Sequence, residues 1–173
     1  MIWVLWGVTA KRAIRLQSAT SRLTQAAVLV PSFWMLFSPA FRLGPLAWRL
    51  LPHTTLTEIA AIVLTVLGFA IAAWARIHLG GNWSASVTVK QDHLLIQTGP
   101  YALVRHPIYS GMSVAALGIA VLNGDLRSFA GLALMVLGWR MRFGLEEKFM
   151  IDQFGIQYIE YRQRVKALIP FVW

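Results

Sequence analysis

The 173-residue sequence contains no cysteine, which excludes disulfides, thiolate metal ligands and a cysteine nucleophile. It is also poor in charge, because Asp, Glu, Lys and Arg make up only 13% of it. Soluble domains carry about twice that share. Hydrophobic residues account for 57% of the chain. This composition predicts an integral membrane protein.

Acidic residues are scarcer than basic ones: 7 Asp and Glu stand against 16 Lys and Arg, a formal net charge of +9. On a membrane protein this excess favours anionic headgroups over nucleic acid, and no recognisable nucleic-acid-binding motif is present. The four histidines are too scattered for a metal site, so we expect no metal. A glycine-rich dinucleotide fingerprint is also absent. The lipid bilayer is the partner that the composition indicates.

Four apolar stretches predict four membrane-spanning helices, since a span needs about 20 residues. They cover residues 23–41, 56–78, 107–122 and 126–144. Residues 1–10 are expected to form an interfacial helix, because tryptophans there precede basic residues. Residues 145–161 alternate charged and apolar side chains, which predicts an amphipathic helix broken at Gly155. The expected fold class is all-α, an integral membrane helical bundle forming a single domain over residues 1–173.

The distribution of basic residues predicts the orientation of this multi-pass protein. With four spans both termini lie on one side, and that side collects thirteen of the sixteen Lys and Arg residues. The positive-inside rule therefore places both termini and the long loop at residues 80–106 in the cytoplasm.

Residues 99–111 combine an arginine, a histidine, two tyrosines and two prolines at the start of the third apolar stretch. Pro107 suits the first position of a helix, which needs no amide hydrogen. Arg105 and His106 therefore lie at the boundary between water and an apolar environment. Taken alone, an Arg-His-Pro sequence here is typical of an anchor at the membrane interface.

The predicted spans at residues 107–122 and 126–144 form a helical hairpin, which Arg105 precedes and Glu146 and Glu147 follow. The two glutamates are therefore expected to meet the Arg105 segment at the cytoplasmic end of this hairpin. Adjacent glutamates at a membrane surface are costly unless they are solvated or paired. The alternative interpretation is a solvated helix start, with Glu146 paired to Arg142 four residues earlier.

These motifs occur in one order along the second half of the chain. They are Gly81-Asn82-Trp83-Ser84, Gly99-Pro100-Tyr101, Arg105-His106-Pro107 with Tyr109 and Gly111, Glu146-Glu147, Phe154-Gly155, Tyr158, Tyr161, Arg164-Val165 and Ile169-Pro170. In this order they resemble the isoprenylcysteine carboxyl methyltransferase and phospholipid methyltransferase family of integral membrane enzymes. The resemblance covers residues 79–173, whereas residues 1–78 contain apolar spans without a specific motif.

The resemblance implies an α-helical membrane enzyme that binds S-adenosylmethionine in a cytoplasmic pocket and acts on a lipophilic or prenylated substrate. By the family pattern, Arg105, Glu146 and Glu147 are catalytic, and Arg105 and Arg164 bind substrate. The implied cofactor-binding residues are Gly99, Tyr101, His106, Pro107, Tyr109 and Glu147. Spacing leaves open which glutamate faces the site, because neighbouring helical residues point about 100° apart.

The implied chemistry explains these residue types. In methyl transfer the protein must hold donor and acceptor aligned. A carboxylate acceptor is already ionised and needs a cation such as Arg105, whose guanidinium can grip it at two points. An amine acceptor needs a base such as Glu147 to remove a proton. The sequence leaves both acceptors open.

Two other interpretations remain. Sterol reductases, which use NADPH, share the Gly-Pro-Tyr and Arg-His-Pro patterns but are much longer chains. The second is a membrane protein that keeps this fold without catalytic activity.

Overall fold

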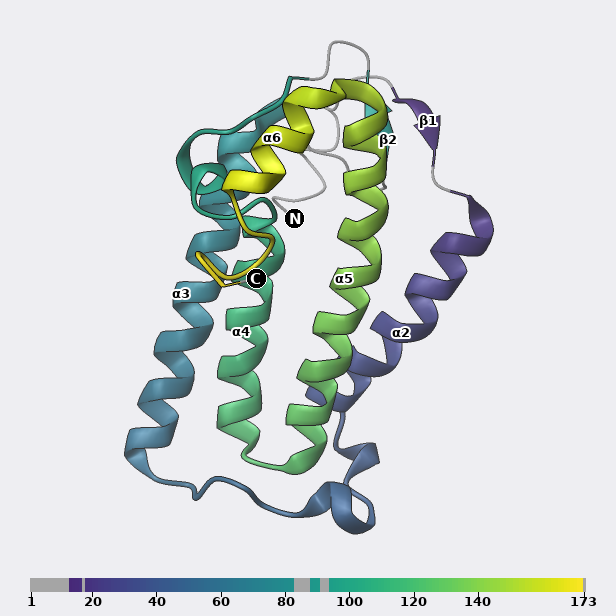
Figure 1. The fold of residues 1–173 in the computed structure, drawn as a ribbon. Helices are drawn as coiled ribbons and strands as arrows, with labels where there is room; N and C mark the ends of the chain where they lie inside the picture. The colour runs from purple at the N-terminus through teal and green to yellow at the C-terminus, as the bar shows by residue number, and fades with distance from the viewer. Residues whose placement is uncertain (1–12, 17, 83–87, 91–93, 173) are drawn as a thin grey trace.

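The computed structural model describes residues 13–16, 18–82, 88–90 and 94–172. Four long helices lie side by side, and a short fifth helix crosses one end of them (Figure 1). The helices are α2 (Ala19–Phe37), α3 (Thr55–Leu79), α4 (Pro107–Asn123), α5 (Leu126–Phe154) and α6 (Ile156–Arg164). The helical bundle expected from the sequence is confirmed. The interfacial helix expected at residues 1–10 lies outside the described residues.

Short elements connect the helices. They are the 3₁₀ helices Pro39–Phe41, Gly44–Ala47, Gly80–Asn82 and Gly99–Ala102, and the strands β1 (Ala13–Leu16) and β2 (Thr88–Lys90). The two strands pair antiparallel. Both strands lie at the same end of the bundle as α6 (Figure 1).

Among the described residues, α3 is the one helix that is both long and apolar enough to cross a membrane by itself. It has 25 residues, whereas the apolar helix α4 has 17. Helix α3 begins at a capping box, in which the Thr54 hydroxyl accepts from the Thr57 amide and the Thr57 hydroxyl accepts from the Thr54 amide. The α4 helix begins at Pro107, as the sequence predicts.

Helix α5 differs from the sequence-based prediction. The fourth span and the first part of the amphipathic helix form one continuous helix of 29 residues, so the predicted separate start at residue 145 is wrong. No proline interrupts this segment, and Gly144 at the expected boundary does not end the helix. The predicted break at Gly155 is confirmed, since Gly155 adopts φ +55°, a conformation that favours glycine. The chain then reverses into α6 (Figure 1).

Helices α3 and α4 approach each other closely along small residues. A Cβ atom built on Gly68 would lie 2.3 Å from the Ala115 nitrogen, and one on Gly111 would lie 2.6 Å from the Ala72 nitrogen. The sequence predicts that Gly68, Ala72 and Ala75 admit another helix. The structure shows that this partner is α4. The outer face of α3 carries exposed apolar side chains from Leu56 to Ile77, as expected of a surface that faces lipid.

The end of the bundle away from α6 is held by Asp125, which is 3% exposed. Its carboxylate accepts hydrogen bonds from Arg42 Nε at 3.0 Å, from Arg127 Nη2 at 3.2 Å and from the Ser128 amide at 3.0 Å. Burial alone would raise the pKa of Asp125, but these hydrogen bonds outweigh it and lower that pKa. The cluster ties the α2–α3 connection to the turn between α4 and α5.

Candidate active site

The start of α4 is clamped by the segment that follows α6. The Arg105 amide donates to the Lys166 carbonyl at 2.8 Å, and the His106 amide donates to the Ala167 carbonyl at 3.0 Å. The Ser110 hydroxyl donates to the Leu168 carbonyl at 2.6 Å. The bond from the amide of His106, the N-cap residue of α4, satisfies a group that the start of a helix leaves without an internal partner. The three bonds also fix the positions from which Arg105 and His106 project.

Glu147 is the centre of the site, with a side chain only 7% exposed. Its Oε1 atom lies 2.9 Å from Arg105 Nε and 3.0 Å from His106 Nε2, and its Oε2 atom lies 3.3 Å from Arg162 Nε. Burial alone would raise the pKa of Glu147, but the hydrogen bond and charge of His106 and the charge of Arg105 hold it below its usual value. Glu147 is therefore ionised at neutral pH, and the His106 Nε2 atom carries the shared hydrogen.

Glu146 forms a second, less buried cluster beside the first. The Tyr109 hydroxyl donates to its Oε1 atom at 2.5 Å, and Arg142 Nε lies 2.9 Å from that hydroxyl and 3.4 Å from Oε1. The Glu146–Arg142 pair of the alternative interpretation is therefore present, with Tyr109 inserted into it. The His106 Nδ1 atom lies 3.8 Å from Glu146 Oε2. Both glutamates thus face the start of α4, and Glu147 is the deeper one.

Aromatic rings of α5 support these side chains. The Phe143 ring stacks on His106 with centroids 4.7 Å apart, and the Trp139 ring stacks on Tyr109 at 5.0 Å. Trp139 and Phe143 precede the glutamates by one to two turns, on the same face of α5. An i, i+3, i+4, i+7 spacing on one helix is the sequence signal that could have added them to the candidate site.

Arg105 is more deeply engaged than the sequence predicts. Its Nη2 atom lies 2.8 Å from Glu147, and its Nη1 atom donates to the Arg162 carbonyl at 3.1 Å and also to the Val165 carbonyl. Carbonyls at a helix C-terminus lack partners within the helix and attract cations. Arg105 therefore caps α6 as well as pairing with Glu147, and all three guanidinium nitrogens have a partner.

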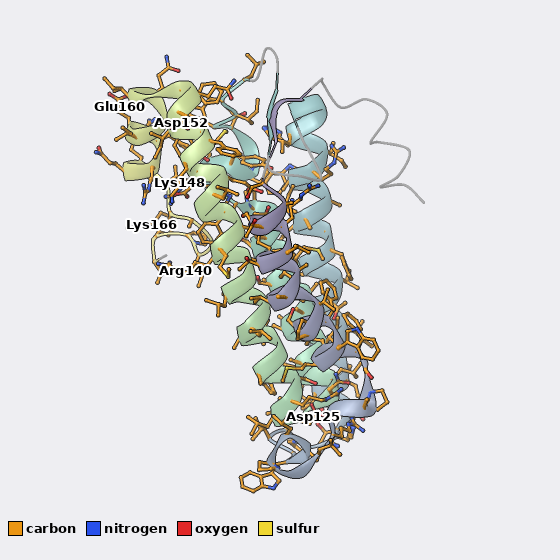
Figure 2. All side chains as sticks on the ribbon, turned by 90° about the vertical axis from the view of Figure 1, so that its right-hand side faces the viewer. Asp125, Arg140, Lys148, Asp152, Glu160 and Lys166 are labelled. Carbon is orange, nitrogen blue, oxygen red and sulfur yellow. The ribbon has the colours of Figure 1, made fainter. Side chains whose placement is uncertain are left out.

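A cavity of about 470 Å³ opens beside this cluster. Its lining residues are Arg105, Arg140, Phe143, Gly144, Glu147, Arg162, Lys166, Ala167 and Val172. Arg105 and Glu147 are the charged residues of the lining whose side chains are buried, whereas Arg140, Arg162 and Lys166 are exposed. Figure 2 shows Arg140 and Lys166 near each other, on the same side of α5. Arg140, Arg162 and Lys166 are not among the site residues that the sequence predicts.

Three of the predicted site residues lie apart from the Glu147 cluster. The Tyr101 carbonyl accepts from the Tyr161 hydroxyl at 2.6 Å, and burial raises the pKa of Tyr101. Gly99, at φ +58°, leaves space for the His78 ring, which a Cβ atom would approach to 2.7 Å. Arg164 is exposed and donates to Gln97 at 3.1 Å. None of the three lines the cavity, and neither do His106, Pro107, Tyr109 and Glu146. Pro107 is buried beside His106 at the first position of α4.

In the described part of the chain, no group of three or more His, Asp or Glu residues could hold a metal ion. The fold and the site together define a helical membrane protein. Its polar, ion-paired site lies at one end of the bundle.

The chain belongs to the isoprenylcysteine carboxyl methyltransferase (ICMT) family, whose model matches residues 61–152. The matched segment contains Arg105, His106, Glu146 and Glu147, whereas Arg162 lies beyond it. Family membership confirms the resemblance found in the sequence.

The relatives include curated enzymes and a solved structure. The chain is 33% identical over 120 residues to protein-S-isoprenylcysteine O-methyltransferase of Schizosaccharomyces pombe, covering 66% of this chain and 50% of the relative. It is 30% identical over 137 residues to the Homo sapiens protein of that name, covering 76% of this chain and 48% of the relative. The chain thus spans about half the length of these relatives. The chain also matches the solved structure of a eukaryotic intramembrane Ras methyltransferase, ICMT, with a TM-score of 0.63 and 24% identity. This match covers 92% of the present chain and 55% of the ICMT chain.

Proposed function

We propose that this chain transfers a methyl group from S-adenosylmethionine to the carboxylate of a lipophilic, prenylcysteine-type acceptor. The observation that carries the proposal is the Arg105–His106–Glu147 cluster, of which Arg105 and Glu147 line a cationic cavity. The names of the curated relatives support the same reaction. Membership of the ICMT family favours this function over an NADPH-dependent reductase.

The residues of the candidate site suit the methyl donor chemically. S-adenosylmethionine has an ammonium and a sulfonium, which need carboxylates or aromatic faces, and a carboxylate, which needs a cation. When bound, it supplies a methyl group activated by the sulfonium charge. We assign its cationic groups to Glu146 and to the aromatic faces of Tyr109 and Phe143. His106 contributes a ring nitrogen beside the same carboxylate.

Glu147 has a different role in this proposal from the one that the sequence implies. Its two oxygens already face Arg105, His106 and Arg162, so a cationic ligand would have to displace one of them. We therefore propose that Glu147 orients Arg105 and His106 and does not hold the cofactor. The assignment of Gly99, Tyr101 and Pro107 to the cofactor, and of Arg164 to the substrate, stays a prediction.

The same charges favour a carboxylate acceptor over an amine. An effective general base has a pKa near the working pH, but the pKa of Glu147 is held below the usual value for a glutamate. Glu147 is therefore a poor base for removing a proton from an amine. A carboxylate needs no base, and Arg105 with Arg162 supplies positive charge on the cavity wall.

Binding and transfer assays with the purified protein test this proposal. Titration calorimetry in detergent should detect S-adenosylhomocysteine and not NADPH. Replacing Glu146→Gln should weaken that binding about ten- to a hundred-fold, the usual cost of one charge-assisted contact. Glu160→Gln, an exposed change on α6, is the matched control. With labelled methyl donor, S-farnesylcysteine with a free carboxylate should gain a methyl group, and phosphatidylethanolamine should not.

Other results would select other functions. Binding of NADPH alone supports a reductase, and binding of neither ligand supports a protein without this activity. Transfer to the amine with none to the carboxylate would contradict the acceptor that we propose.

We also propose that both chain termini lie in the cytoplasm, as the distribution of basic residues predicts. The α6 end of the bundle, with the cavity, would then face the cytoplasm. Reporters placed after the C-terminus and in the turn at Gly124 should give signals from opposite sides of the membrane. Signals from the same side would contradict this orientation.

A further inference from the structure

Gly144 differs from the other glycines inside the α-helices of the described chain. In five of those helical glycines an added Cβ atom would lie 2.3–2.9 Å from an atom of a neighbouring helix: Gly68, Gly111, Gly118, Gly131 and Gly138. Their missing side chains let two helices approach closely. A Cβ atom on Gly144 would have nothing within 4 Å. Helix packing therefore accounts for five of the glycines but not for Gly144.

Backbone conformation does not account for Gly144 either. The described glycines with positive φ lie at helix ends, as Gly124 and Gly155 do, whereas Gly144 lies inside α5 and is not one of them. A glycine in a helix interior is less stable than an alanine, because it has more backbone freedom to lose on folding. Alanine would stabilise α5 at this position without a clash, so the fold alone gives no reason for a glycine.

The free space at Gly144 belongs to the cavity. Gly144 lines the cavity together with Glu147, which follows it by three residues on α5 and therefore neighbours it on the helix surface. Glu147 in turn lies 2.8 Å from Arg105 Nη2. The cavity volume of about 470 Å³ falls within the range of roughly 300–1,000 Å³ that is usual for small-molecule sites. A side chain at position 144 would therefore take up ligand space beside the Arg105–Glu147 pair.

The rest of the lining includes apolar side chains. Phe143 and Ala167 are each 6% exposed and Val172 is 72% exposed, and all three line the cavity. The cavity thus combines the positive charge of Arg105 with apolar surface. A ligand that suits both is a carboxylate joined to hydrocarbon. The acceptor of the proposed methyl transfer is such a molecule, so the assignment of Gly144 rests on the proposed function.

We propose that Gly144 is a specificity-determining residue, which makes room for the methyl-branched hydrocarbon next to the carboxylate of the acceptor. A prenyl chain bears methyl branches, so it is wider at each branch than an unbranched chain of the same length. The side chain of alanine is also one methyl group. Gly144→Ala would therefore fill the space that one branch needs. Gly144 has no assigned contact with S-adenosylmethionine.

Stability and lipid binding of three variants test this role. Gly144→Ala and Gly144→Leu add apolar bulk inside the cavity, whereas Ala133→Leu, the matched control, adds it at an exposed position of α5 outside the lining. Gly144→Ala should raise the melting temperature by about 1–4 °C, because alanine is the better helix former. Gly144→Leu should bind S-farnesylcysteine at least about tenfold more weakly than the parent in calorimetry in detergent, the usual cost of overpacking. Ala133→Leu should bind this lipid like the parent.

A second lipid tests the selection by width. S-dodecylcysteine carries the same carboxylate on an unbranched chain of the same length. Gly144→Ala should lower the preference for S-farnesylcysteine over S-dodecylcysteine about fivefold, the lower end of the cost of one added methyl-sized group. The affinity of both Gly144 variants for S-adenosylhomocysteine should equal that of the parent.

Several results would overturn this role of Gly144. They are an unchanged affinity of Gly144→Leu for S-farnesylcysteine, an equal loss of affinity for both lipids, and an equal loss in Ala133→Leu. Lost turnover in Gly144→Ala with unchanged lipid affinity would indicate a hinge in α5 and would also contradict it. If Gly144→Leu does not fold, Gly144→Ala decides.

Failure of the proposed function would look different. A parent protein that binds S-farnesylcysteine, but neither binds S-adenosylhomocysteine nor transfers a methyl group, refutes the methyl transfer. The same lipid titrations of the Gly144 variants then still decide whether Gly144 selects the branched chain. A parent protein that does not bind S-farnesylcysteine refutes the role of Gly144 directly.

Discussion

Arg105→Lys separates an interface anchor from a residue that organises the site. If Arg105 only anchors the start of α4 at the headgroups, lysine serves as well, because both side chains reach the interface with one positive charge. In the structure, however, Arg105 contacts Glu147 and also donates to the carbonyls of Arg162 and Val165. A lysine can keep the ion pair but has one nitrogen in place of three.

The expected loss of folding stability in Arg105→Lys follows from these contacts. Hydrogen bonds that involve a charged group contribute about 1.5–3 kcal/mol each. The two bonds to α6 carbonyls share one nitrogen of Arg105, so we count them together as roughly 2–3 kcal/mol. The side chain is 9% exposed, and solvent screening therefore reduces this value little. For a chain of this length the melting temperature should fall by about 5–10 °C.

The assay combines unfolding with turnover. We expect Arg105→Lys to lower the melting temperature by that amount and, at a temperature where it is folded, to lower turnover at least about tenfold, or 1.4 kcal/mol in the barrier. Arg164→Lys is the matched control for the unfolding measurement, since Arg164 is exposed and donates a hydrogen bond to Gln97. It should change stability by less than about 0.5 kcal/mol.

The result that would refute this reasoning is an unchanged melting temperature for Arg105→Lys. Unchanged stability with lost turnover would leave Arg105 as a substrate contact alone. Unchanged stability with full turnover would restore the anchor interpretation.

Three further predictions follow from the buried charges and the helix contacts. The pKa of Glu147 is lowered in the folded state, so its charge stabilises the fold at pH values above 4.5, the usual pKa of a glutamate, and that stabilisation is lost as the pH falls. Between pH 7 and pH 3 the melting temperature should therefore fall less steeply for Glu147→Gln, which is already less stable than the parent at pH 7. Asp125→Asn should lower the free energy of unfolding by about 3–5 kcal/mol, because it removes the charge of a buried partner of two arginines. The affinity of the folded fraction for S-adenosylhomocysteine should stay the same. Gly111→Leu should not fold, because its Cβ would lie 2.6 Å from α3 backbone, and size-exclusion chromatography should then yield no folded protein. Gly144→Ala, whose Cβ would have nothing within 4 Å, should fold normally.

Local signals in the sequence determined the helical elements. Apolar runs predicted helices in the regions of α2 to α5, and Pro107 marked the start of α4, because a proline lacks the amide that a first turn does not use. Gly155 marked the break before α6, because it can adopt positive φ. Small residues on α3 predicted a close helix contact. The motifs that identified the family are also local, and they contain the residues that meet at the site.

Long-range contacts were decided by the tertiary structure. The sequence did not reveal that Arg162 reaches Glu147, because this pair depends on the reversal of the chain after Gly155. Nor did it reveal that Arg105 caps α6, since the two segments are nearly 60 residues apart. The choice between Glu146 and Glu147 depended on the rotation of α5 about its axis. That rotation is set by how α5 packs against α2 and α4, which no single stretch of sequence encodes, because burial and ion pairing depend on several helices at once.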